Sequence, residues 1–393
     1  MTYGMVAPDA DRKTMSRIMF VATTPFAVNA FLAPHIEALS KHYEIILCVN
    51  LNLYALSPHL SDLVEVVDIG FERKLSPLRD LISLILLFSA VRRTRPVAIH
   101  SITPKAGLLA MLAGFLAGVP NRWHTFTGQI WATRRSFSLY LLKAMDRFIV
   151  LLSTRIFADS ASQCRFLHDE RVVSVNGISV LGRGSIAGVD VERFHPDESV
   201  RKGLRKELGC RDDACVFLFV GRLVRDKGVF DLVSSYCEVA GRTPGVGLWV
   251  VGPDEEGLLQ ELQSVGQTCD ASIRWLDATH APEKYMMAAD VLVLPSYREG
   301  FGSVIIEAAA CGVPVVAYRI DGVIDAVVDG ETGILVDCGS TKQLTEAILS
   351  LAENPCRRIE LGRQARERVM QHFRSDLITA AWVEYYRNSL GSN

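Results

Sequence analysis

Short runs of β-branched and apolar residues alternate with longer helical patterns along almost the whole chain. This alternation constrains the fold most, because parallel strands need a crossover between them and the crossover is usually a helix. It predicts an α/β protein with two doubly wound parallel sheets in series. The strands expected in the first sheet are 18–22, 45–49, 64–68, 97–100, 123–126, 155–158 and 178–181, and those in the second are 216–220, 247–251, 273–276, 291–294, 315–317 and 334–336.

A chain of 393 residues has room for two cores of ordinary domain size. Residues 182–196 are rich in glycine and have no helical period, so they are expected to cross between the domains. We predict an N-terminal Rossmann-like domain over 17–190 and a C-terminal one over 191–375. A terminal helix within 376–393 is expected to pack back on the first domain.

Composition excludes several classes of protein. A net charge of -2 and 49% hydrophobic residues are ordinary for a soluble globular protein and unlike a basic nucleic-acid binder. Nine cysteines without a C-x-x-C pair favour neither a disulfide framework nor a zinc site, and are compatible with a reducing cytoplasm. The first 16 residues lack the apolar region of a secretory signal and are expected to fray.

Two stretches could contact a membrane surface. Residues 81–91 run into Arg92, Arg93 and Arg95, and Arg134 with Arg135 precedes the apolar residues 137–142. Burial of both stretches as core helices with solvated ends is the alternative. The longest apolar-plus-glycine run, 107–119, is shorter than the roughly 18 residues that span a bilayer. We therefore expect a cytoplasmic protein with at most peripheral contact to the inner membrane leaflet.

The segment 294–308 runs from a predicted strand end through a glycine turn into a predicted helix. Glu299 is placed in the loop and Glu307 about one turn inside the helix, so the two carboxylates could hold opposite ends of one elongated ligand. Glycines and free N–H groups at a helix start favour a diphosphate, which makes a nucleotide sugar the ligand of choice. The expected donor-binding residues are Tyr297, Gly300, Phe301, Gly302, Ser303 and Glu307.

The alternative for this segment is a solvated Glu299 with Glu307 on an ordinary helix face. Apolar neighbours on both sides of Glu307 disfavour it, because a buried carboxylate is costly unless it is paired or bound to a ligand.

A second segment, 219–228, places Arg222 and Lys227 directly after another strand. Two cations there could neutralise the charge that grows on a departing diphosphate, although an exposed basic loop would have the same sequence.

Together these segments resemble family 4 of the retaining glycosyltransferases, which have the two-domain GT-B architecture with a cleft between the domains. The family's Glu-x7-Glu pattern is matched by Glu299 and Glu307. The resemblance implies that Glu299 contacts the transferred sugar, Glu307 the ribose, and Arg222 with Lys227 the diphosphate. It also implies that His124, within the predicted strand 123–126, approaches an outer hydroxyl of the donor sugar, and that the anomeric configuration is retained.

The segments 294–308 and 185–196 look closest to bacterial enzymes that extend polyprenyl-diphosphate-linked glycans for surface polysaccharide or glycoprotein. This likeness implies a hexose or N-acetylhexosamine donor, with an amino sugar favoured. Asn29 lies in a loop without the glycines that many relatives carry there, and we place it on the acceptor side or in positioning of the donor. Lys105 is also placed on the acceptor side, near a lipid diphosphate, although it could equally be a solvated lysine.

No metal ion or other cofactor is expected. The only Asp-x-Asp pair, Asp9 and Asp11, lies in the leader, and Arg222 and Lys227 could take over the role of a metal on the diphosphate. Two rival functions stay open. A non-hydrolysing sugar-nucleotide epimerase would share the architecture, and a non-catalytic regulator that binds a nucleotide sugar would need Glu307 but not Glu299.

Overall fold

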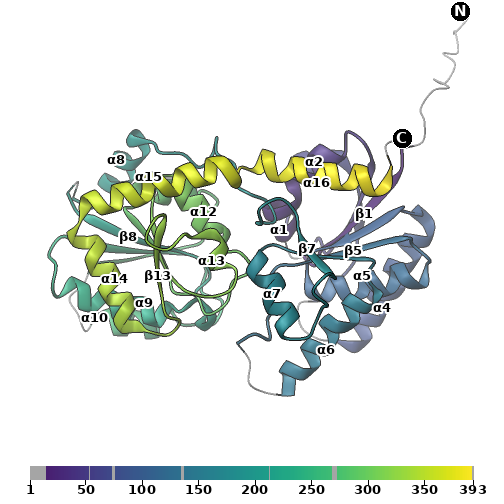
Figure 1. Cartoon of the computed structure of the whole chain (residues 1–393), viewed down its shortest axis with the longest axis horizontal. Coiled ribbons are helices and arrows are strands. Elements are labelled where there is room, and N and C mark those ends of the chain that lie inside the picture. Colours follow the sequence, from purple (N-terminus) through teal and green to yellow (C-terminus); the bar gives the residue numbers. More distant parts are fainter. Residues whose placement is uncertain are drawn as a thin grey trace, which may run out of the picture. The chain divides into compact units, whose positions relative to one another are not determined.

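The computed structural model describes residues 15–52, 54–72, 76–133, 137–211, 213–267 and 272–391, and contains two parallel sheets (Figure 1). The first sheet has the strand order β3-β2-β1-β4-β5-β6-β7 and the second β10-β9-β8-β11-β12-β13. In the first sheet the strands are β1 (Arg17–Val21), β2 (Glu44–Val49), β3 (Val64–Asp68), β4 (Ala98–Ser101), β5 (Asn121–Phe126), β6 (Arg155–Ala158) and β7 (Ile178–Val180). In the second they are β8 (Cys215–Val220), β9 (Val246–Val251), β10 (Ile273–Leu276), β11 (Val291–Leu294), β12 (Val315–Tyr318) and β13 (Gly333–Val336).

Helices connect successive strands, as parallel pairing requires. Those of the first half are α1 (Pro25–Ala27), a π-helical turn (Val28–Leu32), α2 (Ala33–Leu39), α3 (Pro58–Leu63), α4 (Pro77–Thr94), α5 (Pro104–Leu116), α6 (Phe137–Leu152) and α7 (Ala161–Asp169). Those of the second half are α8 (Glu198–Glu207), a 3₁₀ turn (Arg225–Lys227), α9 (Val229–Ala240), α10 (Leu259–Gln267), α11 (Pro282–Ala288), α12 (Ser303–Ala310), α13 (Val323–Ala326), α14 (Thr341–Glu353), α15 (Pro355–His372) and α16 (Ser375–Leu390). The predicted doubly wound α/β fold is confirmed, and each expected strand is present within one or two residues.

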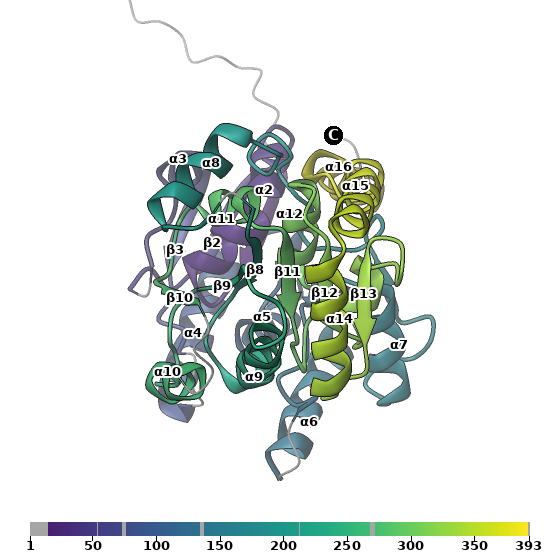
Figure 2. The ribbon, with the colours of Figure 1, turned by 90° about the vertical axis from the view of Figure 1, so that its left-hand side faces the viewer.

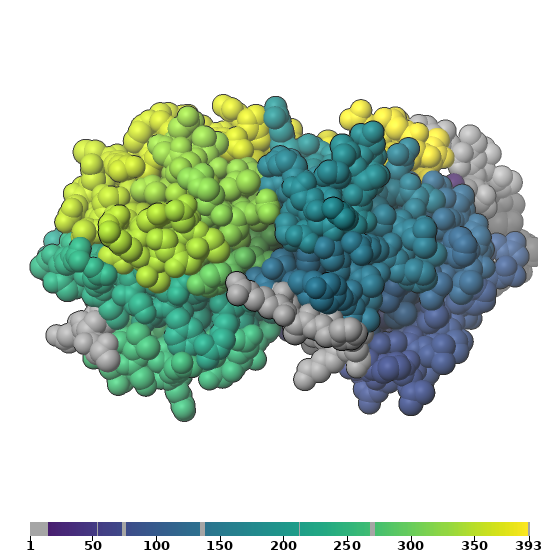
Figure 3. Space-filling model, turned by 60° about the horizontal axis from the view of Figure 1, so that its bottom comes forward, coloured from purple at the N-terminus to yellow at the C-terminus, as the bar shows by residue number. Residues whose placement is uncertain are grey.

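Packing divides the described chain into two compact units. The first contains the described residues up to Thr125, Phe148–Arg155 and the chain from Trp382 onwards; the second contains Phe126–Arg147 and Ile156–Ala381. This division follows contacts and not ligand binding, so the functional domains predicted at 17–190, 191–375 and 376–393 stay predictions. Figure 3 shows teal-green and yellow-green segments of the second unit packed side by side on its surface.

The second sheet is covered by helices on both faces (Figure 2). On one side α9 packs against α10 and α14, and on the other α11 packs against α8 and α12, which in turn packs against α15. Burial on both faces explains why β8 and β11 are continuous apolar runs without alternation. The loops that follow β8 and β11 therefore leave the core at the same edge of the sheet.

In the first unit, α16 supplies rings to the core. Trp382 stacks between the imidazoles of His35 and His100, with ring centroids 4.3 and 4.9 Å away and interplanar angles of 6° and 12°. The Tyr386 hydroxyl lies 2.6 Å from Nδ1 of His100, whose Nε2 lies 2.8 Å from Oγ1 of Thr125. The end of the chain is thereby built into the core of the first unit.

No helix within the described residues is both long and apolar enough to cross a membrane. The same residues contain no group of three His, Cys, Asp or Glu side chains that could hold a metal ion. Asp9, Asp11, Arg134 and Arg135 lie outside the described residues.

Candidate functional site

The loop between β11 and α12 carries most of the predicted donor-binding residues. Gly302 has φ 74° and caps α12, which begins at Ser303. Gly300 is packed so closely that a Cβ atom there would lie 2.5 Å from both Oδ2 of Asp159 and the carbonyl oxygen of Thr127. Only glycine fits at position 300, so the backbone of this loop is held in one place beside the free N–H groups at the start of α12.

The structure brings Glu299 and Lys227 together, although 72 residues separate them. Nζ of Lys227 lies 2.5 Å from Oε1 of Glu299, and the two side chains are 19% and 12% exposed. Their loops approach closely because Gly228, with φ 65°, lies directly against the carbonyl of Pro295. The pair thus places a cation and an anion at the edge of the second sheet where the strands end.

Arg222 follows β8 in the same loop, and its Nη1 lies 2.8 Å from Oε2 of Glu255. The guanidinium is about half exposed, so this ion pair is held only weakly in water. Arg222 can therefore exchange Glu255 for an anionic ligand at small cost. Glu255 was not predicted, and nothing in its local sequence distinguishes it from a solvated glutamate.

Glu307 lies on α12, partly buried beneath apolar neighbours. Burial raises the pKa of its carboxyl to about 7; the charge of Arg193 lowers this pKa and that of Glu283 raises it. Arg193 and Glu283 form an ion pair of their own, 2.7 Å long. A carboxyl that is only partly ionised at neutral pH gains from hydrogen-bond donors supplied by a ligand.

The other predicted donor-binding residues differ in what they offer. The Tyr297 hydroxyl donates to Oδ2 of Asp231 at 2.6 Å, and Tyr318 donates to the same oxygen at 2.7 Å. The ring of Phe301 is buried and packs edge-on against Phe373. Phe301 can therefore reach a ligand only through its backbone. Its role and those of Tyr297, Gly300, Gly302 and Ser303 stay predictions.

Asp159, which is buried, and Arg298, whose side chain is 21% exposed, are polar residues of the second unit that the sequence did not single out. Burial raises the pKa of Asp159 well above its ordinary value, and the charges of Glu299 and Asp325 raise it further. Its carboxyl lies directly against the backbone of Gly300. Arg298, next to Glu299, bonds Oδ2 of Asp226 at 3.2 Å. Asp159 stands in no motif, and Arg298 lies within the segment 294–308 without a signal of its own, so only tertiary contacts reveal them.

His124 belongs to the first unit and is fully buried at the end of β5. Its Nδ1 lies 2.8 Å from Oγ of Ser101, and a Cβ atom at Gly107 would lie 2.5 Å from its ring. Burial lowers the pKa of His124 to about 3. The imidazole is neutral near pH 7, and its approach to a hydroxyl of the donor sugar stays a prediction.

The predicted acceptor-side residues are both engaged within the first unit. Asn29 donates from Nδ2 to the carbonyl of Ala55 at 3.0 Å, and its Oδ1 accepts from the amide of Ser57 at 3.1 Å. Nζ of Lys105 lies 2.5 Å from Oδ1 of Asp80, with both side chains mostly buried. Lys105 is thus not a solvated lysine, and the acceptor role of both residues stays a prediction.

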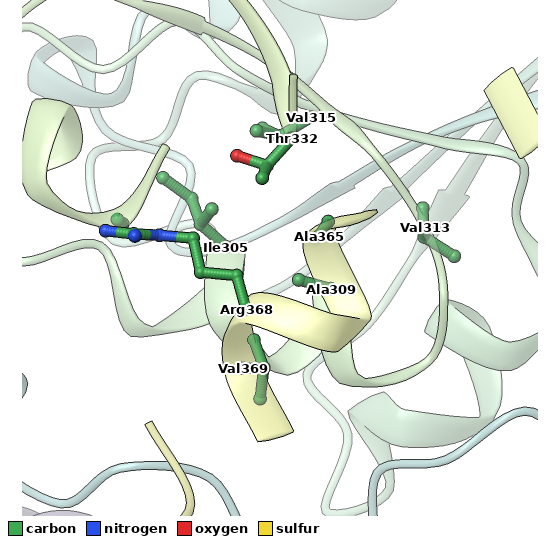
Figure 4. Close-up of a pocket in the computed structure, with 9 residues that line it drawn as sticks. Ile305, Ala309, Val313, Val315, Thr332, Ala365, Arg368 and Val369 are labelled. Atoms are coloured by element: carbon green, nitrogen blue, oxygen red, sulfur yellow. The ribbon is translucent and has the colours of Figure 1, made fainter. Parts of the chain in front are cut away.

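Two cavities of the second unit lie away from these residues. One of about 10 Å³, room for a single water, separates Ile305 and Ala309 of α12 from Arg368 and Val369 of α15 (Figure 4). The other, about 370 Å³, is lined by Arg201, Asp290, Arg358 and neighbouring residues. Asp290 immediately precedes β11, so this cavity is at the opposite edge of the sheet from Glu299.

The chain resembles known proteins both in sequence and in fold. The family model described as "Glycosyl transferases group 1" matches residues 200–368. The capsular polysaccharide biosynthesis glycosyltransferase CapM of Staphylococcus aureus is 33% identical over 310 residues, which are 79% of this chain and 80% of CapM. Two solved structures share the fold: sucrose-phosphate synthase from Thermosynechococcus elongatus and Anabaena Alr3699/HepE in complex with UDP and glucose. The first has a TM-score of 0.78, 21% identity and coverage of 96% of this chain and 100% of that one. The second has a TM-score of 0.78, 19% identity and coverage of 94% and 99%.

Proposed function

This chain belongs to the group 1 glycosyl transferases, and from that premise we propose that it extends a polyprenyl-diphosphate-linked glycan. The donor is a nucleoside diphosphate hexose or N-acetylhexosamine, with an amino sugar favoured, and the product belongs to a surface polysaccharide or glycoprotein glycan. The observation that carries this proposal is the Lys227–Glu299 pair. The same edge of the sheet also supplies the N-terminus of α12 and Arg222.

In this proposal the donor lies across the carboxyl edge of the second sheet. Lys227 and Arg222 neutralise the diphosphate, Glu299 accepts hydrogen bonds from the transferred sugar, and Glu307 accepts them from the ribose. The bond from the anomeric carbon to the diphosphate breaks, and a bond to an acceptor hydroxyl forms on the same face. The hydroxyl proton passes to the leaving diphosphate. His124 contributes as a neutral hydrogen-bonding group.

We also propose that the reaction needs no metal ion. A divalent cation at a diphosphate stabilises the charge that develops as the sugar leaves. Arg222 and Lys227 carry two positive charges, and the α12 N-terminus adds a partial one. These groups supply the same kind of stabilisation, so activity should survive a chelator.

A lipid-linked acceptor requires the enzyme to work at the cytoplasmic face of the membrane, and α4 offers a surface for this. Its outward residues Leu78, Leu81, Ile82, Ile85 and Leu86 are 48–79% exposed. The spacing places them on one helical face, opposite buried Ser83, Leu87 and Val91. Arg92 and Arg93 end the same helix and would meet anionic headgroups.

The test is release of nucleoside diphosphate from a panel of nucleotide sugars in EDTA, with and without a short polyprenyl-diphosphate-sugar acceptor. We expect acceptor-dependent release from one donor, lost in Glu299→Ala and kept in the matched control Glu360→Ala. Glu360 is an exposed residue of α15 that pairs with Arg363. Isomerisation of the donor without acceptor would favour the epimerase instead. Binding of a nucleotide sugar without turnover of any donor would favour the non-catalytic regulator.

A further inference from the structure

The start of α7 forms hydrogen bonds with two loops. One is the loop between β11 and α12 that carries Glu299, and the other is the loop that precedes α13. Oγ of Ser160, the N-cap of α7, donates to the carbonyl of Gly300 at 3.0 Å. Oγ of Ser162 accepts from the amide of Gly322 at 2.6 Å and itself bonds Oδ2 of Asp325, which also accepts from the Ser162 amide at 2.9 Å. We call Ser160, Ser162, Asp325 and the two glycines the serine clasp; all five residues belong to the second unit.

Glycine packing leaves the clasp almost no freedom to shift. A Cβ atom at Gly322 would lie 2.4 Å from the carbonyl oxygen of Gly300, and one at Gly128 would lie 3.1 Å from the Gly300 amide. Gly300 thus touches three segments that are distant in sequence. Its carbonyl and amide are adjacent to the Glu299 backbone, so any shift at Gly300 moves the Glu299 carboxylate as well.

Both serines are fully buried, and none of their bonds serves a sheet. Ser160 also caps α7 by accepting from the Gln163 amide, which is a structural role. Ser162 has no such second role: its side chain bonds only the Gly322 amide, Asp325 and, at 3.4 Å, Ser160 among the contacts of the described residues. Substitution of Ser162 therefore tests the clasp without removing the cap of α7.

We propose that Ser162, with Ser160 and Asp325, positions Glu299 for sugar transfer without touching the substrate. This inference rests on the proposed function and adds positioning residues to it. The clasp bonds the backbone of the loop directly after Glu299, while Lys227 pairs with the Glu299 carboxylate. Glu307, on α12, is outside the clasp, so its proposed contact with the ribose does not depend on these serines.

Displacement of a catalytic group by about 1 Å can lower a rate on the order of 100-fold. Ser162→Ala should therefore lower kcat by roughly 10- to 100-fold. Its affinity for the bare nucleoside diphosphate, measured by calorimetry, should stay close to that of the wild type. Asp325→Asn should behave in the same way, and the double variant should lose no more than either single one, because both changes open the same clasp.

The matched control is Ser235→Ala. Ser235 is a buried serine of α9 whose hydroxyl donates to the carbonyl of Thr341, in the same unit but away from Glu299. It should lower thermal stability to a similar degree while leaving kcat unchanged. The proposal is overturned if Ser162→Ala keeps wild-type kcat, or if its kcat and nucleotide affinity fall together as general loosening would cause.

A second readout separates this inference from the choice of acceptor. Glu299 is expected to contact the sugar, so the wild type should bind the intact nucleotide sugar more tightly than the nucleoside diphosphate. Ser162→Ala should lose this preference even when no acceptor is turned over. An unchanged preference in Ser162→Ala would overturn the positioning role. Failure of every acceptor, with the preference present in the wild type and lost in Ser162→Ala, would count only against the proposed function.

Discussion

At the scale of single residues, Glu307 stands out because its burial opposes its expected task. A carboxylate that must accept hydrogen bonds from a ligand is kept among apolar side chains, and burial raises its pKa to about 7. Ionisation of Glu307 in the free protein therefore costs free energy, and hydrogen bonds from a bound ribose would offset that cost. Sites that bind ligands commonly combine a perturbed titratable group with reduced stability.

The first prediction concerns the stability of a Glu307→Gln variant. The folded-state pKa lies above the ordinary value of 4.5, so ionisation destabilises the fold increasingly as pH rises from 4.5 through 7. The glutamine should therefore gain up to about 3 kcal/mol over the wild type at pH 8 and little at pH 4.5, while donor binding weakens. Urea unfolding at both pH values measures this, and an equal gain at both would contradict the ionisation argument.

The second prediction concerns the cation at the donor diphosphate. Lys227→Gln removes the partner of Glu299 and one charge from the proposed leaving group. Loss of one preorganised electrostatic group costs on the order of 100- to 1000-fold in kcat. Arg225→Gln is the matched control, because Arg225 lies in the same turn and pairs with exposed Glu261. Equal kinetics of the two variants would remove Lys227 from the mechanism.

At the scale of elements, α16 contributes buried aromatic rings to the core of the first unit. Trp382 and Tyr386 are almost fully buried, between His35, His100 and Trp123. Neutral histidines suit such a stack, and burial holds the pKa of His100 well below its ordinary value. The aromatic cluster joins the chain end to strands that precede it by about 260 to 290 residues.

The third prediction follows from this cluster. Trp382→Ala should destabilise the first unit by roughly 3–5 kcal/mol, the usual cost of removing a large buried ring. Leu377→Ala, on the same helix but 44% exposed, should cost less than about 1 kcal/mol. Thermal unfolding followed by tryptophan fluorescence and calorimetry measures the difference, and comparable losses in both variants would refute the importance of the ring.

At the scale of the whole molecule, the outward face of α4 groups five exposed apolar side chains on a chain whose net charge is near zero. Contiguous exposed apolar residues on a soluble protein generally mark an interaction surface. The neighbouring Arg92 and Arg93 add the charge that an anionic bilayer attracts. Association with a membrane would then depend on both lipid charge and ionic strength.

The fourth prediction tests that surface with vesicles containing phosphatidylglycerol. Ile82→Asp with Ile85→Asp should lower co-sedimentation at least 5-fold, because two charges would be placed in the apolar interface. Turnover of a short water-soluble acceptor should not change. Ile359→Asp on α15, at a position 72% exposed, is the control and should sediment like the wild type. Wild-type protein that stays in the supernatant would rule out membrane docking.

The secondary structure and the doubly wound fold were predictable from the sequence. Hydrophobic periodicity identifies strands and helices locally, and turn glycines mark where they end, so all thirteen strands were expected at their observed places. The Glu299–Glu307 segment could also be recognised as a candidate donor site, because its residues are close in sequence. Lys227 and Arg222 were predicted as cations for the diphosphate, whereas their ion pairs with Glu299 and Glu255 were not.

Only the tertiary structure decided which side chains meet. The Lys227–Glu299 pair, the Tyr297 bond to Asp231 and the inward turn of the Phe301 ring depend on how loops from separate strands pack. The serine clasp is the clearest case, since Ser162 and Asp325 are 163 residues apart and neither stands in a recognisable motif. Local periodicity reports which face of an element is buried, whereas contacts between loops depend on the register and packing of the complete sheets, which no local pattern encodes.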